Sequence, residues 1–339
     1  MTLTLTPHGW QAAATALVVA SGLLSTLPAA AQNPAPAPGA GLAFPNKPIK
    51  IMVPFTAGSG ADSASRFYGE QLSKLLNQTV TVENRPGGSG VVAVQAVRAA
   101  PADGHMILMG SNSPVVVNAI TIKNLPYDPF KDLRPLYGIA ISPVAFAVRA
   151  DSPYKTMADL VAASKKDNRP LQLGNYSAGY QLGAAWLGTA SGLAVNHIPY
   201  KGGAQMLTDV VGGQLDVGVV DFTGTVELMK GGRLRVLAIT ADKRDAKYPD
   251  IPTMKESGFP DFETAVWSAF FLRAETPDDV VDKLAAAMQK AMTSEAGRAY
   301  HATLPAAAMM MGPKELGAFQ LKEYQRFKRV ADSAGIKPE

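Results

Sequence analysis

The sequence predicts an α/β fold of two α/β lobes with parallel-rich sheets, joined by two crossover strands. From residue 50 onward short apolar segments alternate with helical ones, a pattern typical of a parallel sheet covered on both faces. The chain has 339 residues, which is more than a single core fills comfortably, so two domains are expected. Two further apolar, strand-like segments, Val144–Val148 and Val266–Leu272, flank the middle of the chain. We expect these two segments to connect the lobes.

The N-terminal segment predicts export. Residues 1–31 contain no Lys, Arg, Asp or Glu, and Ala12–Leu27 is an apolar core too short to span a bilayer comfortably. Ala29 and Ala31 give the small-x-small pattern that signal peptidase recognises. We therefore expect a signal peptide cleaved after Ala31 and a mature protein in a bacterial periplasm. No Lys or Arg precedes the apolar core, which is atypical of a signal peptide. An N-terminal membrane anchor is the alternative. Residues 32–43, rich in Pro, Ala and Gly, predict a linker.

The first-lobe elements follow in order, each inferred from the spacing of its apolar residues. They are a strand at Lys50–Phe55, a helix at Ala61–Leu76, a strand at Thr79–Glu83, a helix at Val91–Ala99 and a strand at Met106–Met109.

The middle of the chain repeats this alternation. Its first helix, Thr156–Lys165, begins with Thr156 as a candidate N-cap and Asp159 at the third helical position. The elements that follow are, in order, a strand at Leu171–Leu173, a helix at Gln181–Ser191, a strand at Val195–Pro199, a helix at Ala204–Val211, a strand at Val217–Val220, a helix at Val226–Lys230 and a strand at Val236–Thr240.

The C-terminal part is predicted to be helical. Helices are expected at Pro277–Thr293 and Pro313–Ala334, with a break near Leu304-Pro305. The first lobe is then discontinuous, comprising residues 44–145 plus 246–339, and the second lobe, 146–245, is inserted into it.

Composition excludes several function classes. The formal net charge is +4 and the basic residues are scattered, so no nucleic-acid partner is expected. Cysteine is absent, which excludes disulfides and thiolate chemistry. Only His105, His197 and His301 remain after the expected cleavage, and their spacing does not suggest a metal site. No metal and no cofactor is expected.

A turn in the first lobe has the character of an anion site. Gly58-Ser59-Gly60-Ala61-Asp62-Ser63 follows a strand and opens a helix, where free amides and the helix dipole attract negative charge. It nearly matches the dinucleotide fingerprint, and Glu83 ends the next strand where a ribose-binding acid would sit. Ser63 replaces the third glycine, however, and an exported protein has no NAD supply. A tight turn with an ordinary N-cap is the plain alternative.

Other small-residue turns are expected at the same sheet edge. Gly87–Gly90 precedes a helix, and Gly110-Ser111-Asn112-Ser113 follows a strand. The carboxyl ends of parallel strands lie together, and such edges bind ligands. Ser111 and Asn112 are therefore candidate ligand contacts.

The second lobe supplies its own candidates. Gly174–Gly179 (GNYSAG) approaches the G-x-S-x-G elbow of serine hydrolases, but Ser177 is one residue out of register and no histidine is a clear partner. A ligand loop is the better interpretation, with Tyr176, Ser177, Ala178, Gly179 and Tyr180 as contacts.

Asp221 and Phe222 follow another second-lobe strand and complete the candidates. The Asp221 carboxylate accepts a hydrogen bond from a ligand or caps the following turn; the sequence leaves both open.

Six segments in order resemble one known family. They are FPNKPIKIMVPFTAGSGADSASR, VTVENRPGGSGVVAVQAV, PADGHMILMGSNS, NLPYDPFKDLRPL, HIPYKGGAQMLTDVVGGQLDVGVVD and GGRLRVLAITADKR. Residues 44–339 thereby resemble the substrate-binding receptors of tripartite tricarboxylate transporters, the Bug family.

That resemblance implies a fold like that of type II periplasmic binding proteins. It also implies a small carboxylate ligand, held through backbone groups and ordered water in the turn Phe55–Asp62. The residues to which it assigns this role are Phe55, Ala57, Gly58, Ser59, Gly60 and Asp62. The family's Gly-Gly is Gly58-Ser59 here, and its second-lobe loop is the aromatic NYSAGYQ, which hints at a flat or aromatic ligand.

The predicted function is that of a periplasmic solute-binding protein for a small organic carboxylate, a di- or tricarboxylate or an aromatic acid. The protein is expected to be a monomer, to catalyse no reaction, and to deliver its ligand to integral-membrane permease subunits. The alternatives are an exported serine hydrolase using Ser177 and a ligand sensor subunit for a membrane kinase.

Overall fold

The computed structural model describes residues 43–260, 262, 264–333 and 335–338. The predicted signal peptide, its cleavage after Ala31 and all of the linker except Ala43 lie outside the described residues. Contacts group Leu42–Glu339 into one compact unit, so the expected limits of the two lobes stay a prediction. None of the helices in the described ranges is both long and apolar enough to cross a membrane.

The described strands build one mixed sheet. The strands are β1 (Ile49–Val53), β2 (Val80–Asn84), β3 (Met106–Ser111), β4 (Leu133–Arg149), β5 (Leu171–Asn175), β6 (Val195–Pro199), β7 (Val217–Asp221), β8 (Leu234–Ile239), β9 (Ala265–Arg273) and β10 (Ala307–Ala308). Their order is β2-β1-β3-β9-β4-β7-β5-β6, with β8 and β10 also paired to β4. Pairs within each lobe are parallel, whereas β4 and β9 run antiparallel to their neighbours.

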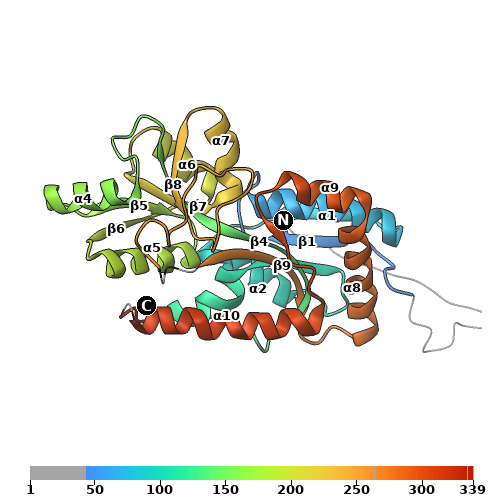
Figure 1. Cartoon of the computed structure of the whole chain (residues 1–339). Coiled ribbons are helices and arrows are strands. Elements are labelled where there is room, and N and C mark those ends of the chain that lie inside the picture. The colour runs from blue at the N-terminus through green and yellow to red at the C-terminus, as the bar shows by residue number, and fades with distance from the viewer. Residues whose placement is uncertain (1–42, 261, 263, 334, 339) are drawn as a thin grey trace, which may run out of the picture. The chain divides into compact units, whose positions relative to one another are not determined.

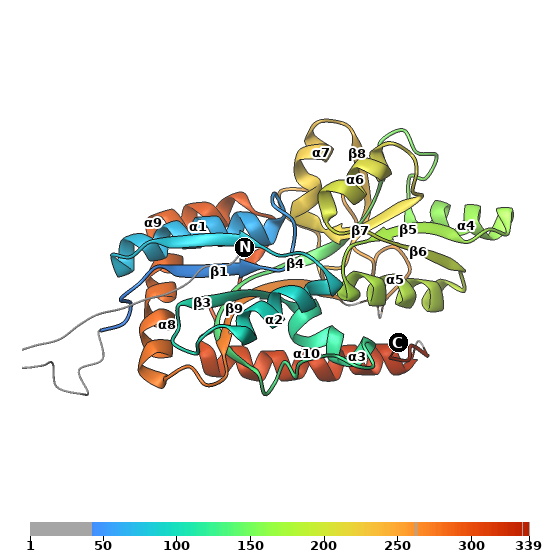
Figure 2. The same cartoon turned by 180° about the vertical axis from the view of Figure 1, so that it is seen from behind.

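Helices cover both faces of this sheet. They are α1 (Gly60–Leu76), α2 (Val91–Ala99), α3 (Asn118–Thr121), α4 (Met157–Asp167), α5 (Ala178–Ser191), α6 (Gly203–Val211), α7 (Val226–Lys230), α8 (Asp278–Thr293), α9 (Glu295–Thr303) and α10 (Pro313–Ser333). Short 3-10 helices lie at Gly88–Gly90 and Phe222–Thr225, and a π-helical turn lies at Ser113–Val117. Figure 1 shows α1 and α9 on one side of the first-lobe strands and α10 on the other, and Figure 2 shows the same arrangement from behind.

Alternation along the strands explains why both faces are covered. In β1, Ile51 and Val53 pack into the core beneath α1 and α8, whereas Met52 between them packs into the core beneath α2 and α10. In β4, Phe146 and Ala147 likewise enter the two separate cores of the second lobe. Since adjacent side chains point to opposite faces, a strand apolar at every position is buried on both sides.

The two predicted crossover strands are confirmed, and β4 extends beyond its prediction. Its first half, Leu133–Pro143, pairs with β9, and its second half, Val144–Arg149, pairs with β7 and β8. The change of partner at Pro143-Val144 carries the chain from one lobe to the other. The two-lobe α/β prediction is therefore correct.

Local signals correctly predicted several helices and missed two, α3 and α9. Thr156 and Asp159 form a reciprocal capping box at the start of α4, as their spacing predicted. The predicted helix at Gln181 begins three residues earlier, at Ala178, so the second-lobe loop is shorter than expected. α9 was not predicted, although Ser294 caps it by accepting a hydrogen bond from the Gly297 amide at 3.0 Å.

Candidate functional site

A cleft lies where the carboxyl ends of the first-lobe strands meet those of the second lobe. Its volume is about 460 Å³, which suits a small organic molecule. Its walls come from the turn before α1, the end of β3, the middle of β4 and β9, the loop before α5, the end of β7, and α9 with the residues after it.

The turn before α1 is held open by its own side chains. The Ser59 hydroxyl accepts a hydrogen bond from the Asp62 amide at 3.2 Å, and Asp62 accepts one from the Gly58 amide at 2.9 Å. Gly58 has a φ of +81°, which favours glycine. The amides of Gly60 and Ala61, the first two residues of α1, make no hydrogen bond within the described residues, and both residues line the cleft. These are the helix amides that a ligand anion can use.

Asp62 supports this turn from behind. Burial alone would raise the pKa of its carboxyl group. Hydrogen bonds from Arg66, the Gly58 amide and Asn84 outweigh burial and lower that pKa below its ordinary value. The ionised carboxylate therefore fixes the turn, and Asp62 does not line the cleft.

The second-lobe wall is formed by a tyrosine pair and one acid. The Tyr176 hydroxyl donates to Asp221 Oδ2 at 2.8 Å and lies 3.1 Å from the Tyr180 hydroxyl. The other Asp221 oxygen accepts from the Gly224 amide at 2.8 Å. Burial raises the pKa of Asp221 and raises those of both tyrosines well above their ordinary value. The ring of Phe55 meets Tyr176 edge-on across the cleft, with 6.0 Å between the ring centroids.

The start of α5 is bound to the first lobe. The Ala178 amide donates to the Ser89 hydroxyl at 3.2 Å, and the Gly179 amide donates to the Ser113 hydroxyl at 3.0 Å. First-lobe side chains thus accept the hydrogen bonds of two helix amides, which are therefore not available to a ligand. Ser177 lines the cleft as the N-cap residue of α5, and no hydrogen bond of the described residues joins its hydroxyl to a histidine.

Two polar atoms beside the cleft have no partner in the described part of the chain. They are the hydroxyl oxygen of Ser111, which is 5% exposed, and Nδ1 of His301. His301 Nε2 lies 2.5 Å from the Tyr68 hydroxyl, and burial lowers the pKa of His301, which favours the neutral ring. Buried polar groups normally have a partner, so both atoms mark positions where a ligand or water can bind.

Most of the sequence-predicted residues surround this cleft. Those that line it are Phe55, Gly58, Ser59, Gly60, Ser111, Asn112, Tyr176, Ser177, Tyr180 and Asp221. Those that do not are Ala57, Asp62, Ala178, Gly179 and Phe222. Phe222 is fully buried in the second-lobe core and packs against Tyr248. Whether the lining residues contact a ligand stays a prediction.

The sequence analysis missed the parts of the wall formed by the middle of β4 and β9 and by α9. Tyr300 and His301 of α9 and Leu304 after it line the cleft, because the Tyr300 ring stacks on Phe67 of α1 at 4.1 Å between centroids. The Ser294-Glu295 start signal could have revealed α9. Its position against α1 depends on tertiary packing, which no local pattern shows.

Electrostatic partners argue against the dinucleotide interpretation. Glu83, the candidate ribose-binding acid, pairs with Lys50 at 2.6 Å and with Arg85 at 2.5 Å. It therefore lacks the free carboxylate that a ribose would need. Among the described residues no group of three potential metal ligands is found.

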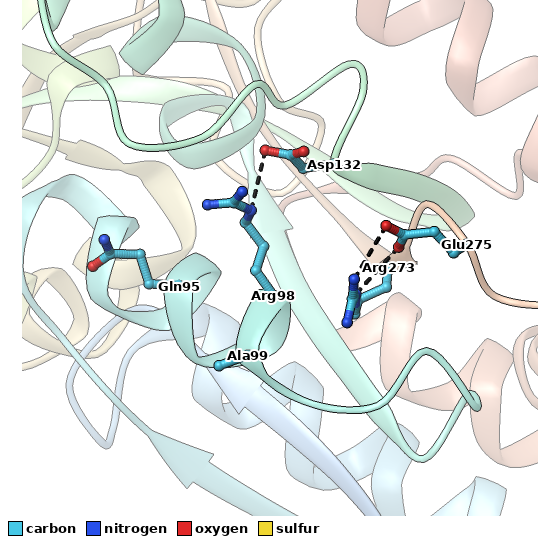
Figure 3. A pocket seen from close by; sticks show the side chains of 6 residues that line it. All are labelled: Gln95, Arg98, Ala99, Asp132, Arg273 and Glu275. Atoms are coloured by element: carbon cyan, nitrogen blue, oxygen red, sulfur yellow. Dashed lines mark hydrogen bonds and ion pairs between the residues drawn. The ribbon is translucent and has the colours of Figure 1, made fainter.

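A second hollow lies on the first lobe, away from the cleft (Figure 3). Its volume is about 360 Å³. Arg98 pairs there with Asp132 at 3.1 Å, and Arg273 pairs with Glu275 at 3.1 Å. Both guanidinium groups also donate to backbone carbonyl oxygens. Since both positive charges already have partners, this hollow suits an anion less well than the cleft does.

Comparison with known proteins places the chain among binding proteins. It is 32% identical over 296 residues to a UPF0065 protein of Bordetella bronchiseptica, covering 87% of this chain and 88% of that one. The solved periplasmic binding protein BugD is 28% identical, with a TM-score of 0.83, and the match covers 87% of this chain and all of BugD. An R. palustris protein solved with adipate is 29% identical, with a TM-score of 0.83 and the same coverage.

A family model also identifies the chain as a receptor. The model for the tripartite tricarboxylate transporter family receptor matches residues 64–336. A receptor binds its ligand without transforming it, so the prediction that the protein is not an enzyme is confirmed by its family. The fold, the cleft between the lobes and the match over most of the chain agree. The chain belongs to the tripartite tricarboxylate transporter receptor family.

Proposed function

We propose that this protein is a periplasmic receptor that captures a small organic carboxylate in the cleft and delivers it to the permease subunits of a membrane transporter. The observation that carries the proposal is the pair of Gly60 and Ala61 amides at the start of α1, neither of which donates to another described residue. Helix amides favour a negatively charged oxygen, and the Ser111 hydroxyl, which lines the same cleft and has no partner among the described residues, adds a donor. The adipate in a related structure supports the ligand class.

Substitution of Gly60 tests the carboxylate site. A Cβ built on Gly60 lies 3.7 Å from Asp221 Oδ1 and meets no backbone, so Gly60→Val should fold but fill the space beside the amides. Ligands are first found by a thermal-shift screen of carboxylates, since ligand at 100 times its Kd adds about 2.7 kcal/mol to stability. Calorimetry should then show at least a tenfold loss of affinity, about 1.4 kcal/mol.

The control is Gly312→Val. Gly312 precedes α10, lies outside the cleft, and a Cβ there meets nothing within 4 Å. The affinity of the Gly312→Val protein for the carboxylate should equal that of the wild type. Equal affinity of the folded Gly60→Val protein would place the carboxylate elsewhere.

Export and delivery have tests of their own. We propose that residues 1–31 are removed, so the intact mass of the periplasmic protein should correspond to a chain that begins at Gln32.

We also propose that the mature protein acts as a monomer, which light scattering measures. Loss of uptake of the identified ligand in cells lacking this chain, restored by the wild type and not by Gly60→Val, would establish delivery to a permease.

A further inference from the structure

The described lining of the cleft contains acidic side chains but no lysine or arginine. Among its described lining residues there is no Lys or Arg, and the acids are Asp221 and Glu227. Glu227 pairs with Lys230 at 3.0 Å, and its side chain is 84% exposed. Asp221 forms no ion pair with any described cation, and its hydrogen-bond partners are a tyrosine hydroxyl and a backbone amide. The cleft therefore carries one acid that no positive charge balances.

That acid faces the proposed carboxylate site. A Cβ built on Gly60 would lie 3.7 Å from Asp221 Oδ1, so the first turn of α1 and the Asp221 carboxylate oppose each other across the cleft. A ligand carboxylate at the Gly60 and Ala61 amides would lie close to a second negative charge. Like charges at such distances oppose ionisation of both groups.

A ligand that brings its own positive charge removes this conflict. An α-amino acid carries its ammonium group one carbon from its carboxylate, so the two groups can reach Asp221 and the α1 amides together. Each Asp221 oxygen accepts one hydrogen bond within the protein, which leaves acceptor positions for an ammonium group. The zwitterion adds no net charge to the cleft.

The remainder of the cleft suits an apolar side chain. Ala61 and Ala64 line it along α1, and Tyr68, one turn beyond Ala64, holds His301 at the far wall. Tyr300, Leu304 and Ile139 add apolar surface there. A second carboxylate at this wall would meet no lysine or arginine from the described residues.

We propose that the ligand is an α-amino acid with an apolar or aromatic side chain, whose ammonium group binds Asp221 while its carboxylate binds the amides at the start of α1. The inference rests on the proposed carboxylate receptor function and narrows its ligand class. It disfavours dicarboxylates such as the adipate of the related structure.

Matched ligand pairs test this inference by calorimetry. The amino acids are phenylalanine, tyrosine and leucine, each as both enantiomers. Each is compared with the acid that lacks the amino group: 3-phenylpropanoate, 3-(4-hydroxyphenyl)propanoate and 4-methylpentanoate. Adipate is the dicarboxylate. At least one amino acid should bind at least tenfold more tightly than its deamino partner and than adipate.

Asp221→Asn should then reverse this preference. Without the carboxylate, the amino acid should lose at least tenfold in affinity and the deamino acid should gain. The matched control is Asp209→Asn: Asp209 accepts a hydrogen bond from Tyr200 at 2.7 Å in the same lobe and does not line the cleft. Its ligand preference should equal that of the wild type.

Three results would overturn the inference. They are equal or tighter binding by the deamino acid in each pair, tightest binding by adipate, and failure of all three amino acids to bind. In the first two cases a carboxylate still binds and the proposed receptor function stands. If the wider carboxylate screen also finds no ligand, the proposed function fails with it.

Discussion

Asp62 shows how one side chain prepares a ligand site that it does not touch. Its carboxylate accepts hydrogen bonds from the Gly58 amide, Asn84 and Arg66, so it joins the turn, the end of β2 and the first turns of α1. This fixed turn leaves the Gly60 and Ala61 amides without a hydrogen-bond partner among the described residues. The family resemblance suggested a direct role in binding for Asp62, and its position behind the turn supports a positioning role.

Asp62→Asn should weaken both stability and ligand binding. An amide cannot accept from all three donors, and hydrogen bonds to charged groups contribute about 2 kcal/mol each. We expect a loss of about 2 kcal/mol in the free energy of unfolding at pH 7, measured by urea unfolding, and a lower ligand affinity by calorimetry. Asp159→Asn, in the capping box of α4 and outside the cleft, should leave affinity unchanged.

The pH dependence of this loss has a defined sign. The folded pKa of Asp62 lies below its ordinary value, so the stabilisation is complete above that value and is lost as pH falls through the folded pKa. The difference in unfolding free energy between the wild type and Asp62→Asn should therefore shrink below about pH 4. A difference that is constant from pH 7 to pH 3 would contradict the ionised role.

At the scale of elements, the loop before α2 has a backbone conformation that favours glycine. Gly87, Gly88, Ser89 and Gly90 all have positive φ, and only Ser89 is not a glycine. The loop carries the Ser89 hydroxyl to the Ala178 amide at the start of α5. The glycines around it permit a path that other residues would strain.

Gly90→Ala should therefore destabilise the protein. A Cβ there would lie 2.9 Å from Pro114 Cβ and 3.2 Å from Pro54 Cβ, at a φ of +96°. Strain of this kind costs about 1–3 kcal/mol. The control is Gly192→Ala, which has a φ of +68° but no atom within 4 Å, and should cost about 1 kcal/mol. Equal losses in urea unfolding would mean that the contact with the prolines has no effect.

The elements also show how far the sequence determines the fold. Strands with a largely apolar run, such as β1 and β3, and helices with clear caps, such as α4, were predictable from local patterns. The first half of β4 was not, because Pro135, Gly138 and Pro143 interrupt its apolar run and prolines argue against an inner strand. The register of β4 against β9 is irregular next to Pro135 and Gly138, so the strand tolerates these residues by local shifts in pairing.

The candidate site was predictable to a similar extent. Turns at the carboxyl ends of strands could be placed at one sheet edge by topology alone, which gave Gly60, Ser111 and Asp221. Their hydrogen bonds could not be deduced, so Asp62 and Phe222 were grouped with residues that line the cleft. The wall formed by α9 depends on packing between segments more than 200 residues apart, such as Tyr68 and His301.

At the scale of the whole molecule, two strands, two hydroxyl contacts and side-chain packing join the lobes, since Ala178 and Leu182 of α5 lie in a first-lobe core and Phe55 meets Tyr176. β4 and β9 carry the covalent connection, while Ser89 and Ser113 bind the amides at the start of α5. Across the cleft, a Cβ on Gly202 would lie 2.2 Å from the Thr56 hydroxyl, so the lobes approach closely there. These contacts describe a closed arrangement around the cleft.

Ser89→Ala combined with Ser113→Ala should shift the ligand-free protein toward an open arrangement. The α5 amides would lose their acceptors, whereas the connecting strands would remain. Small-angle scattering should show a larger radius of gyration than in the wild type, and saturating ligand should reduce it. If the radius of gyration of the ligand-free double variant equals that of the ligand-bound wild type, the hydroxyl contacts do not control closure.

Trp267 offers a second measurement of closure. It is fully buried on β9, lines the cleft, and donates its indole N–H to Glu323 at 3.2 Å. Trp186 stacks on Phe262 in the second lobe, with 4.6 Å between ring centroids. In a Trp186→Phe variant, ligand binding should change the fluorescence emission of Trp267. If both the emission and the radius of gyration are unchanged by ligand, the cleft is rigid.

The position of β9 has a consequence for the order in which the chain can fold. β9 lies between β3 and β4 in the sheet, although more than 150 residues separate it from β3 along the chain. During synthesis from the N-terminus, β1 to β3 therefore emerge long before the strand that covers the edge of β3. The strands β5 to β8 of the second lobe, by contrast, are made in one continuous stretch, and residues up to Phe262 complete the cores around them. We expect this inserted lobe to fold first, leaving the earliest-made strands dependent on the last third of the chain and on chaperones until then.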